Sequence, residues 1–160
     1  MLSSDGMWSQ ENQEQKAQYW RSIFDTIPLP AFIVDAEVRI EDFNTAAEQL
    51  LSPEPALALQ RRGGEAFHCI NAEHGGCGKA EPCEDCAIRN SIRRAITGRT
   101  THRELHQVRL REGGRVHAID LLVTASLLPY TDPPRALLLL ENLTEVVKLR
   151  RRRTRRASRS

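Results

Sequence analysis

The segment Ile27-Pro28-Leu29-Pro30-Ala31-Phe32-Ile33-Val34-Asp35 separates a predicted helix from a predicted strand. Apolar residues recur at helical spacing before it, which predicts an amphipathic helix over about residues 9–27. Pro28 and Pro30 disfavour helical backbone and therefore end this helix. The apolar run at residues 31–34 is bounded by Asp35 and predicts a short strand. The chain therefore enters its sheet directly from a helix.

A second strand and a short helix follow at once. Residues 39–43 predict the strand, and Asn44 is a favourable N-cap for a helix that carries alanines and leucines up to Leu51. Residues 53–64 contain two prolines and a Gly-Gly pair, and we expect a loop or short helical turns there.

The second half of the chain predicts one more helix and three strands. Apolar residues repeat at helical spacing over residues 88–96, and Gly98 is expected to stop that helix. Strands are expected at residues 101–111, 115–128 and 135–143, joined by turns that contain Gly or Pro. Two strands, helices and then three hairpin-linked strands predict an α+β fold, an antiparallel sheet with helices on one face.

The order of these elements and the residues at their joints resemble a PAS domain. The similarity lies in residues 27–35, in Phe43-Asn44-Thr45-Ala46-Ala47-Glu48, and in Leu140-Glu141-Asn142-Leu143-Thr144-Glu145. The last segment resembles the family's final strand and its Asp-hydrophobic-Thr exit motif, with Asn142 in place of the acid. The resemblance covers residues 15–147. It implies a PAS-like five-stranded antiparallel sheet in the order 2-1-5-4-3, with a ligand-side helix just before the third strand.

The resemblance also implies a role in sensing or protein interaction, although fold alone does not identify a ligand. The signal would leave the domain at the exit motif, through Asn142, Thr144 and Glu145. A dimer or sheet-packing surface is expected on the N-terminal helix, at Trp20, Phe24 and Ile27.

Charge divides the chain into an acidic body and a basic tail. The 160 residues hold 23 Lys and Arg against 21 Asp and Glu, a formal net charge of +2. Residues 148–160 contain eight of these basic residues and no acid, so residues 1–147 hold 15 basic against 21 acidic residues. We expect a flexible N-terminus over residues 1–14, a PAS domain with its N-terminal helix over 15–147, and a basic tail over 148–160. Six tail arginines are candidates for unspecific contact with nucleic acid or an anionic surface: Arg150, Arg151, Arg152, Arg153, Arg155 and Arg156.

The chain shows no membrane, secretory or catalytic pattern. No stretch approaches the roughly 18–20 consecutive apolar residues that span a bilayer. The N-terminus lacks the basic and apolar regions of a secretory signal. We therefore expect a cytoplasmic protein without a transmembrane segment. Neither a nucleotide-binding glycine loop nor a nucleophile–base pair is visible, so we expect a protein that is not an enzyme.

Four cysteines, the only ones in the chain, lie within 18 consecutive residues: Cys69, Cys77, Cys83 and Cys86. The last two form a C-x-x-C step, and glycines crowd the loop before it. In a reducing compartment such cysteines bind a metal or act as redox thiols rather than forming permanent disulfides. The segment around them also resembles a cysteine-bearing subset of bacterial PAS domains. His68 and His74 are alternate ligands.

Three chemistries fit these thiols. Zinc takes four thiolates in tetrahedral geometry and is the favoured cofactor. An iron–sulfur cluster takes the same four thiolates. A metal-free thiol switch is the third alternative, because a helix that begins at the C-x-x-C step would favour thiolate. Four cysteines without any role are the remaining alternative. His102 and His106 share one face of a predicted strand and are expected to face solvent.

These features predict a sensory or signal-transduction PAS protein with a four-cysteine metal or redox site. It would act through protein contacts, as a homodimer with a signalling protein partner. Two rivals remain: a DNA-binding transcriptional regulator that uses the basic tail, and an iron–sulfur redox sensor that is a fragment of a histidine kinase.

Overall fold

The computed structural model describes residues 10–51 and 53–159. Its centre is a five-stranded sheet in the order β2-β1-β5-β4-β3, in which every neighbouring pair is antiparallel. This is the order that the resemblance to PAS domains implies, and the α+β prediction is confirmed. The strands are β1 (Ala31–Val34), β2 (Ile40–Phe43), β3 (His102–Glu112), β4 (Arg115–Leu128) and β5 (Arg135–Asn142).

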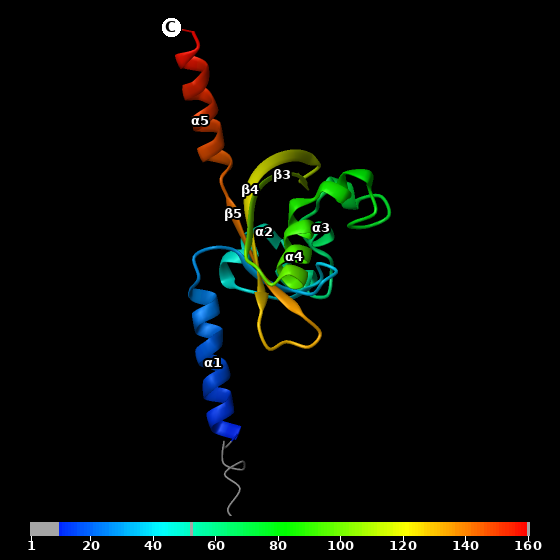
Figure 1. The fold of residues 1–160 in the computed structure, drawn as a ribbon, viewed down its shortest axis with the longest axis vertical. Helices are drawn as coiled ribbons and strands as arrows, with labels where there is room; N and C mark the ends of the chain where they lie inside the picture. Colours follow the sequence, from blue (N-terminus) through cyan, green and yellow to red (C-terminus); the bar gives the residue numbers. More distant parts are fainter. Residues whose placement is uncertain (1–9, 52, 160) are drawn as a thin grey trace, which may run out of the picture.

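The helices differ in length and in how they meet the sheet. The long ones are α1 (Gln10–Thr26), α4 (Ala87–Gly98) and α5 (Thr144–Ala157), and the short ones are α2 (Glu48–Leu51) and α3 (Gly63–Ala66). Helices α3 and α4 lie on one side of the sheet, whereas α1 and α5 extend away from the body in opposite directions (Figure 1). Short 3-10 turns fill the connections, at Thr45–Ala47, Pro55–Ala58, Ile70–Ala72 and Glu81–Asp85.

Helix α1 matches the helix predicted over residues 9–27, and it therefore takes in residues 10–14 of the expected flexible N-terminus. Residues 1–9 lie outside the described part of the chain. The end of α4 differs from its prediction. The residue with left-handed backbone that ends α4 is Arg99, with φ of 53°, so Gly98 is the last helical residue rather than the stop. The basic tail is helical, because α5 runs through residues 148–157.

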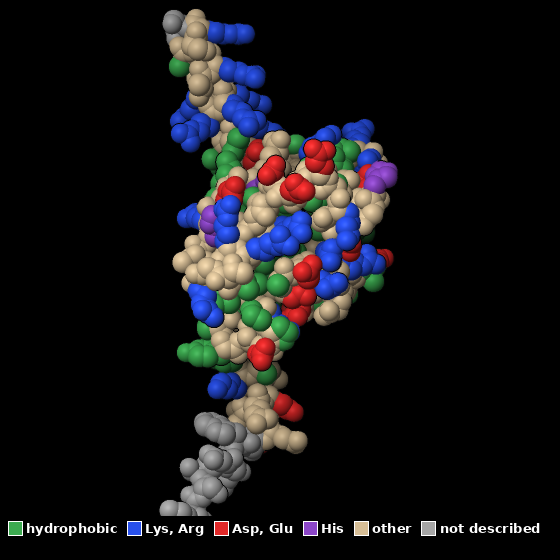
Figure 2. Space-filling view, turned by 45° about the vertical axis from the view of Figure 1, so that its right-hand side comes forward, with side chains coloured by type: hydrophobic (Ala, Val, Ile, Leu, Met, Phe, Trp, Pro, Cys, Tyr) green, Lys and Arg blue, Asp and Glu red, His purple; other side chains and the backbone are tan. Residues whose placement is uncertain are grey.

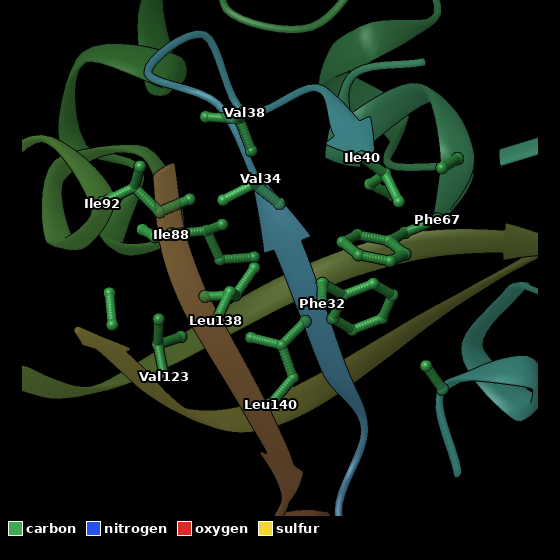
Figure 3. Packing of buried hydrophobic residues seen from close by; sticks show 14 of the residues in the cluster. Phe32, Val34, Val38, Ile40, Phe67, Ile88, Ile92, Val123, Leu138 and Leu140 are labelled. Atoms are coloured by element: carbon green, nitrogen blue, oxygen red, sulfur yellow. The ribbon is translucent and has the colours of Figure 1, made fainter. Parts of the chain in front are cut away.

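The hydrophobic core lies between the sheet and the helices on its inner face. Strand alternation turns Phe32 and Val34 of β1 and Leu138 and Leu140 of β5 inward, and all four side chains are at most 1% exposed (Figure 3). The rings of Phe32 and Phe67 meet edge to face, with centroids 5.3 Å apart. Helix α4 adds its own apolar face to this cluster. Because each fully buried side chain of this kind contributes about 1.5–3 kcal/mol, the cluster fixes α4 against the strands.

The side chain of Asn44 joins α1, β1 and the first helical turn after β2. It is 1% exposed. Its Oδ1 accepts hydrogen bonds from the backbone N–H of Ala31 (2.9 Å) and Ala47 (3.1 Å). Its Nδ2 donates to the carbonyl oxygens of Phe24 (3.2 Å), Ile27 (3.1 Å) and Leu29 (3.0 Å). The predicted N-cap is confirmed, and its amide also binds the chain on both sides of the helix–strand junction.

The last turns of α1 are also held by an exposed ion-pair network. Arg21 Nη1 lies 2.8 Å from Asp42 Oδ1, and its Nη2 donates to the carbonyl oxygen of Phe43 at 2.8 Å. Asp25 Oδ1 accepts from the backbone N–H of Thr45 at 3.1 Å. Bonding with Asp42 raises the pKa of the Arg21 guanidinium, with a smaller contribution from Asp25 in the same direction. The end of α1 is therefore fixed to β2, while its beginning stands clear of the body.

We expect Asn44→Ala to lower the free energy of unfolding by about 3 kcal/mol, because it leaves several buried backbone groups without a hydrogen-bond partner. Urea unfolding measures the effect. Asn12→Ala, an exposed change on α1, is the control and should leave the free energy of unfolding within about 0.5 kcal/mol of the starting value. Equal midpoints for the two variants would contradict the structural role of Asn44.

Candidate thiol site

All four cysteines line one cavity of about 210 Å³. We call this cavity, lined by Cys69, Cys77, Cys83 and Cys86, the thiol pocket. It lies between the cysteine-bearing segment 67–86, the beginning of α4, β3 and the core residues Leu121 and Leu140. Cys83 is buried at 7% exposure, and Cys86 is the N-cap residue of α4. Thiols that are as many as 17 positions apart in the chain therefore face the same space.

The thiol pocket is open rather than closed around an ion. All four cysteines are free thiols. Within residues 10–51 and 53–159, no three His, Cys, Asp or Glu side chains are grouped closely enough to hold a metal ion. The soft thiol donors suit zinc or an iron–sulfur cluster. Their arrangement requires the segment 67–86 to draw in before four of them could bind one ion.

The position of Cys77 is set by the turn that begins α3. Arg62 Nη1 donates to the Cys77 carbonyl oxygen at 3.0 Å, and Glu65 Oε1 accepts from the Cys77 N–H at 3.3 Å. Between them, Gly64 faces the thiol itself: a Cβ added there would lie 2.8 Å from Cys77 Sγ. Only glycine leaves room for sulfur this close to the backbone. Arg62, which is the N-cap residue of α3, together with Gly64 and Glu65 of that helix, therefore fixes the position of Cys77 in its loop.

The other end of the segment is attached to β3. The backbone N–H of Arg111 donates to the carbonyl oxygen of His68 at 2.9 Å, and Cys69 forms an isolated bridge with Leu110. Arg111 also pairs with Glu73. His68 and His74, the alternate ligands, are both exposed, and neither lines the thiol pocket.

His106 lines the thiol pocket, and the expectation that it faces solvent is wrong. It is half-buried, and burial lowers the pKa of its imidazole, although the charge of Glu104 acts in the opposite direction. Strand alternation places His106 on the same face as Val108 and Leu110, which also line the pocket. This alternation along β3 is visible in the sequence, and it would have predicted that His106 faces the core side of the sheet.

Burial and crowding make the thiol pocket a poor place for several thiolates at once. Burial is the main cause that raises the pKa of Cys69, and the nearby thiols of Cys86 and Cys83 add to it, against the polar backbone of Asn71. The pKa of Cys77 is raised for the same reasons, burial first. A bound cation would reverse this balance, because it stabilises thiolate and releases the thiol protons.

The exit motif is tied to β4 rather than standing free. Thr144 Oγ1 accepts from the backbone N–H of Asp120 at 3.0 Å, and Asp120 O accepts from the N–H of Leu143 at 2.8 Å. Asn142 Oδ1 accepts from the N–H and the hydroxyl of Thr144. Asn142 therefore makes these local contacts although it replaces the expected acid. Glu145 is exposed and pairs only with Lys148, at 3.0 Å, among the described residues.

Comparison with known proteins agrees with this architecture. Residues 18–85 match the family model described as PAS domain. This chain contains a PAS domain. No curated protein matches the chain.

Solved PAS structures share the fold at low sequence identity. The PAS domain of nitrogen regulation protein NR(II) from Vibrio parahaemolyticus is 17% identical with a TM-score of 0.52, over 76% of this chain and 95% of that one. A domain of a sensory box sensor histidine kinase/response regulator from Geobacter sulfurreducens is 21% identical with a TM-score of 0.52, over 82% and 97%. An RNA-binding light-oxygen-voltage receptor is 18% identical with a TM-score of 0.63, over 99% of this chain and 40% of the receptor. The PAS fold of this chain is typical of sensory and signal-transduction domains.

The expected surface on α1 of the PAS domain divides into two parts. Phe24 and Ile27 are half-buried against the body, next to the carbonyls that Asn44 binds. Trp20 is 58% exposed, together with its neighbours Tyr19 (62%) and Ile23 (41%). We call these three exposed side chains, Tyr19, Trp20 and Ile23, the α1 apolar face.

The tail arginines surround α5 where it extends beyond the PAS body (Figure 2). Two exposed apolar residues, Val146 and Leu149, lie at its beginning. Beyond Leu149 the helix is polar up to Ala157. Among the described helices, none has both the length and the apolar composition needed to cross a membrane.

Proposed function

We propose that this chain is a sensory PAS module, rather than an enzyme, in which the thiol pocket is the sensing site and protein contacts carry the output. The observation that carries this proposal is the convergence of four free thiols on one cavity beside the first turn of α4. Zinc is the favoured occupant, because four thiolates complete its shell and a site of this kind can be structural. An iron–sulfur cluster is the alternative occupant.

Occupancy would change the order of the segment 67–86. This segment contains few apolar residues, and it holds its shape through the Cys77 contacts with α3 and the His68 and Glu73 contacts with β3. Drawing the thiols together would therefore add order directly, as metal binding does in small zinc modules. Because Cys86 caps α4, the change would reach that helix first.

A path from the thiol pocket to α5 runs through the sheet. Strand β3 lines the pocket, and Gln107 Nε2 on this strand donates to Asp120 Oδ1 on β4 at 3.2 Å. The backbone N–H of Asp120 binds Thr144, the first residue of α5. A shift of β3 against α4 would thus reach the exit helix through two hydrogen bonds. This path supports an output at α5.

The decisive experiment is elemental analysis with an absorption spectrum on protein purified without oxygen. Zinc without visible absorption supports a structural zinc site, and iron with broad visible absorption supports a cluster. We expect Cys83→Ser to lower the free energy of unfolding by about 2–3 kcal/mol at zinc well above its Kd, since binding at 100 times Kd adds about 2.7 kcal/mol. Proteolysis between residues 67 and 86 should increase.

A second variant leaves all four thiols in place. Gly64→Ala should also weaken metal retention, because its Cβ displaces the Cys77 sulfur. Gly98→Ala is the matched control, since a Cβ there makes only ordinary contact, 3.5 Å from Thr100 Oγ1. A metal-free protein with four freely titrating thiols, and unchanged stability after Cys83→Ser, would exclude both metal alternatives.

We also propose that the PAS module forms a homodimer through α1. A 17-residue helix without a buried residue is marginal in water by itself, and the α1 apolar face is uncovered within the chain. Burying this face against a second copy would supply packing that the described residues do not provide. A signalling protein would then contact the dimer beyond the exit motif.

We expect Trp20→Glu to raise the Kd of the dimer by about tenfold or more, because large aromatic residues dominate such interfaces. Sedimentation over a concentration series measures the Kd. Gln13→Glu, an exposed change of the same charge on the same helix, should leave it unchanged. If the starting protein sediments as a monomer at high micromolar concentration, α1 is not a dimer surface.

The cations of α5 favour a second candidate output. The helix projects from the body with basic side chains along its length (Figure 2) and no apolar stripe beyond Leu149, which suits phosphate backbones better than a lipid surface. This is the proposed DNA-binding alternative. In a gel shift with a DNA duplex, we expect salt-sensitive and sequence-independent binding that disappears when residues 148–160 are removed. Binding that survives their removal, or no binding at low salt, would contradict this role.

A further inference from the structure

Two guanidinium groups converge beside the thiol pocket at Gly78. A Cβ built on this glycine would lie 3.8 Å from Arg89 Cζ and 3.9 Å from Arg62 Nη1. Gly78 follows Cys77 directly, and Arg89 lines the pocket from the first turns of α4. Segments from three parts of the chain thus bring two positive charges to the same edge of the four thiols.

Only one of the two guanidinium groups has a carboxylate partner among the described residues. Arg62 pairs with Glu37 at 3.3 Å and donates to the Cys77 carbonyl oxygen. Arg89 is half-buried, and no carboxylate within the described part of the chain forms an ion pair with it. Placing a second, unpaired cation next to the first is unfavourable unless an anion approaches both.

The other charged side chains around the thiol pocket do not neutralise Arg89. Asp85 lines the pocket but is exposed and forms no ion pair with Arg89 among the described residues. Glu65 accepts the N–H of Cys77 and, among the described residues, forms no ion pair with Arg89 or Arg62. His106 and Arg109, on the β3 side, can only add positive charge. The pocket therefore has thiols on several sides and, at the Gly78 edge, a guanidinium that forms no ion pair within the described part of the chain.

We propose that Arg89, supported by Arg62, is a positioning residue that makes the thiol pocket select a metal centre of net negative charge. This inference rests on the proposed metal function of the same pocket. When four thiols bind Zn²⁺, four protons leave to water and the centre carries a net charge of −2, because four thiolates surround one divalent ion. A cluster held by four thiolates is anionic for the same reason. The guanidinium of Arg89 offsets this charge at the point where Cys77 enters.

Zinc titration against a chromophoric chelator tests the proposal on the full chain. We expect Arg89→Gln to weaken zinc affinity by about tenfold, the lower end of what loss of an outer partner of a metal site costs. Arg89→Lys keeps the charge and should restore most of the affinity. Arg93→Gln removes the same charge one turn further along α4, where the side chain is exposed, and should bind zinc like the unchanged protein.

The outcomes separate the two proposals. If the unchanged protein binds zinc and Arg89→Gln binds it equally well, the role of Arg89 is overturned while the metal function stands. Equal weakening by Arg89→Lys and Arg89→Gln would also overturn the assignment, because charge would not be the cause. If the unchanged protein binds no zinc, zinc as the occupant and the role of Arg89 are both overturned, and only the iron–sulfur alternative for the pocket is left. Urea unfolding of the metal-free variants checks that each one remains folded.

Discussion

The buried amide of Asn44 holds together three segments of the chain by hydrogen bonds to their backbone groups. Helix α1, the proline-containing turn and β1 all end or begin within its reach, and its five hydrogen bonds are to backbone groups alone. Backbone groups at such junctions lack partners in a regular helix or strand, so one side chain supplies what secondary structure cannot. This fixes where α1 leaves the body and aligns β1 for pairing with β5. The inner face of the sheet, and hence the wall of the thiol pocket, depends on that alignment.

The same geometry places the beginning and the end of the described fold next to each other in the sheet. Strand β1 pairs with β5, which leads into α5, while α1 leads into β1. The two long helices therefore leave from neighbouring central strands, although they extend in opposite directions (Figure 1). A change in twist at the β1–β5 pair would reach both helices. This arrangement would relate the proposed dimer surface on α1 to the proposed exit on α5, although the two helices extend away from each other (Figure 1).

Local pattern was enough to predict most of the fold. The elements and the N-cap at Asn44 depend on short-range signals, namely alternation, turn residues and a capping side chain. The strand order, in contrast, was implied by the resemblance to PAS domains. The thiol pocket was only partly predictable, since cysteine spacing indicated a common site but not the residues that shape it. Arg62 and Gly64 act on Cys77 across a loop, and Gln107 meets Asp120 only because two strands pair in one register. Such contacts follow from tertiary arrangement, and a single sequence contains no local sign of them.

The thiol pocket combines features that oppose each other in the metal-free chain. Four thiols face one cavity, where burial raises the pKa of Cys69 and Cys77, and a cationic edge at Arg89 lacks a counter-charge. Each feature is mildly unfavourable alone, yet each becomes favourable once a cation converts the thiols to thiolates. Beyond Phe67, which packs in the core, the segment 67–86 contains few large apolar side chains, so little apolar contact must be broken for the thiols to draw together. Under the proposed metal function, this pocket would change its charge and its order in one step, and Cys86, the N-cap residue of α4, would pass both changes to the first turn of that helix. That coupling would give the PAS fold a physical means of converting occupancy of a small site into movement of a helix and a sheet.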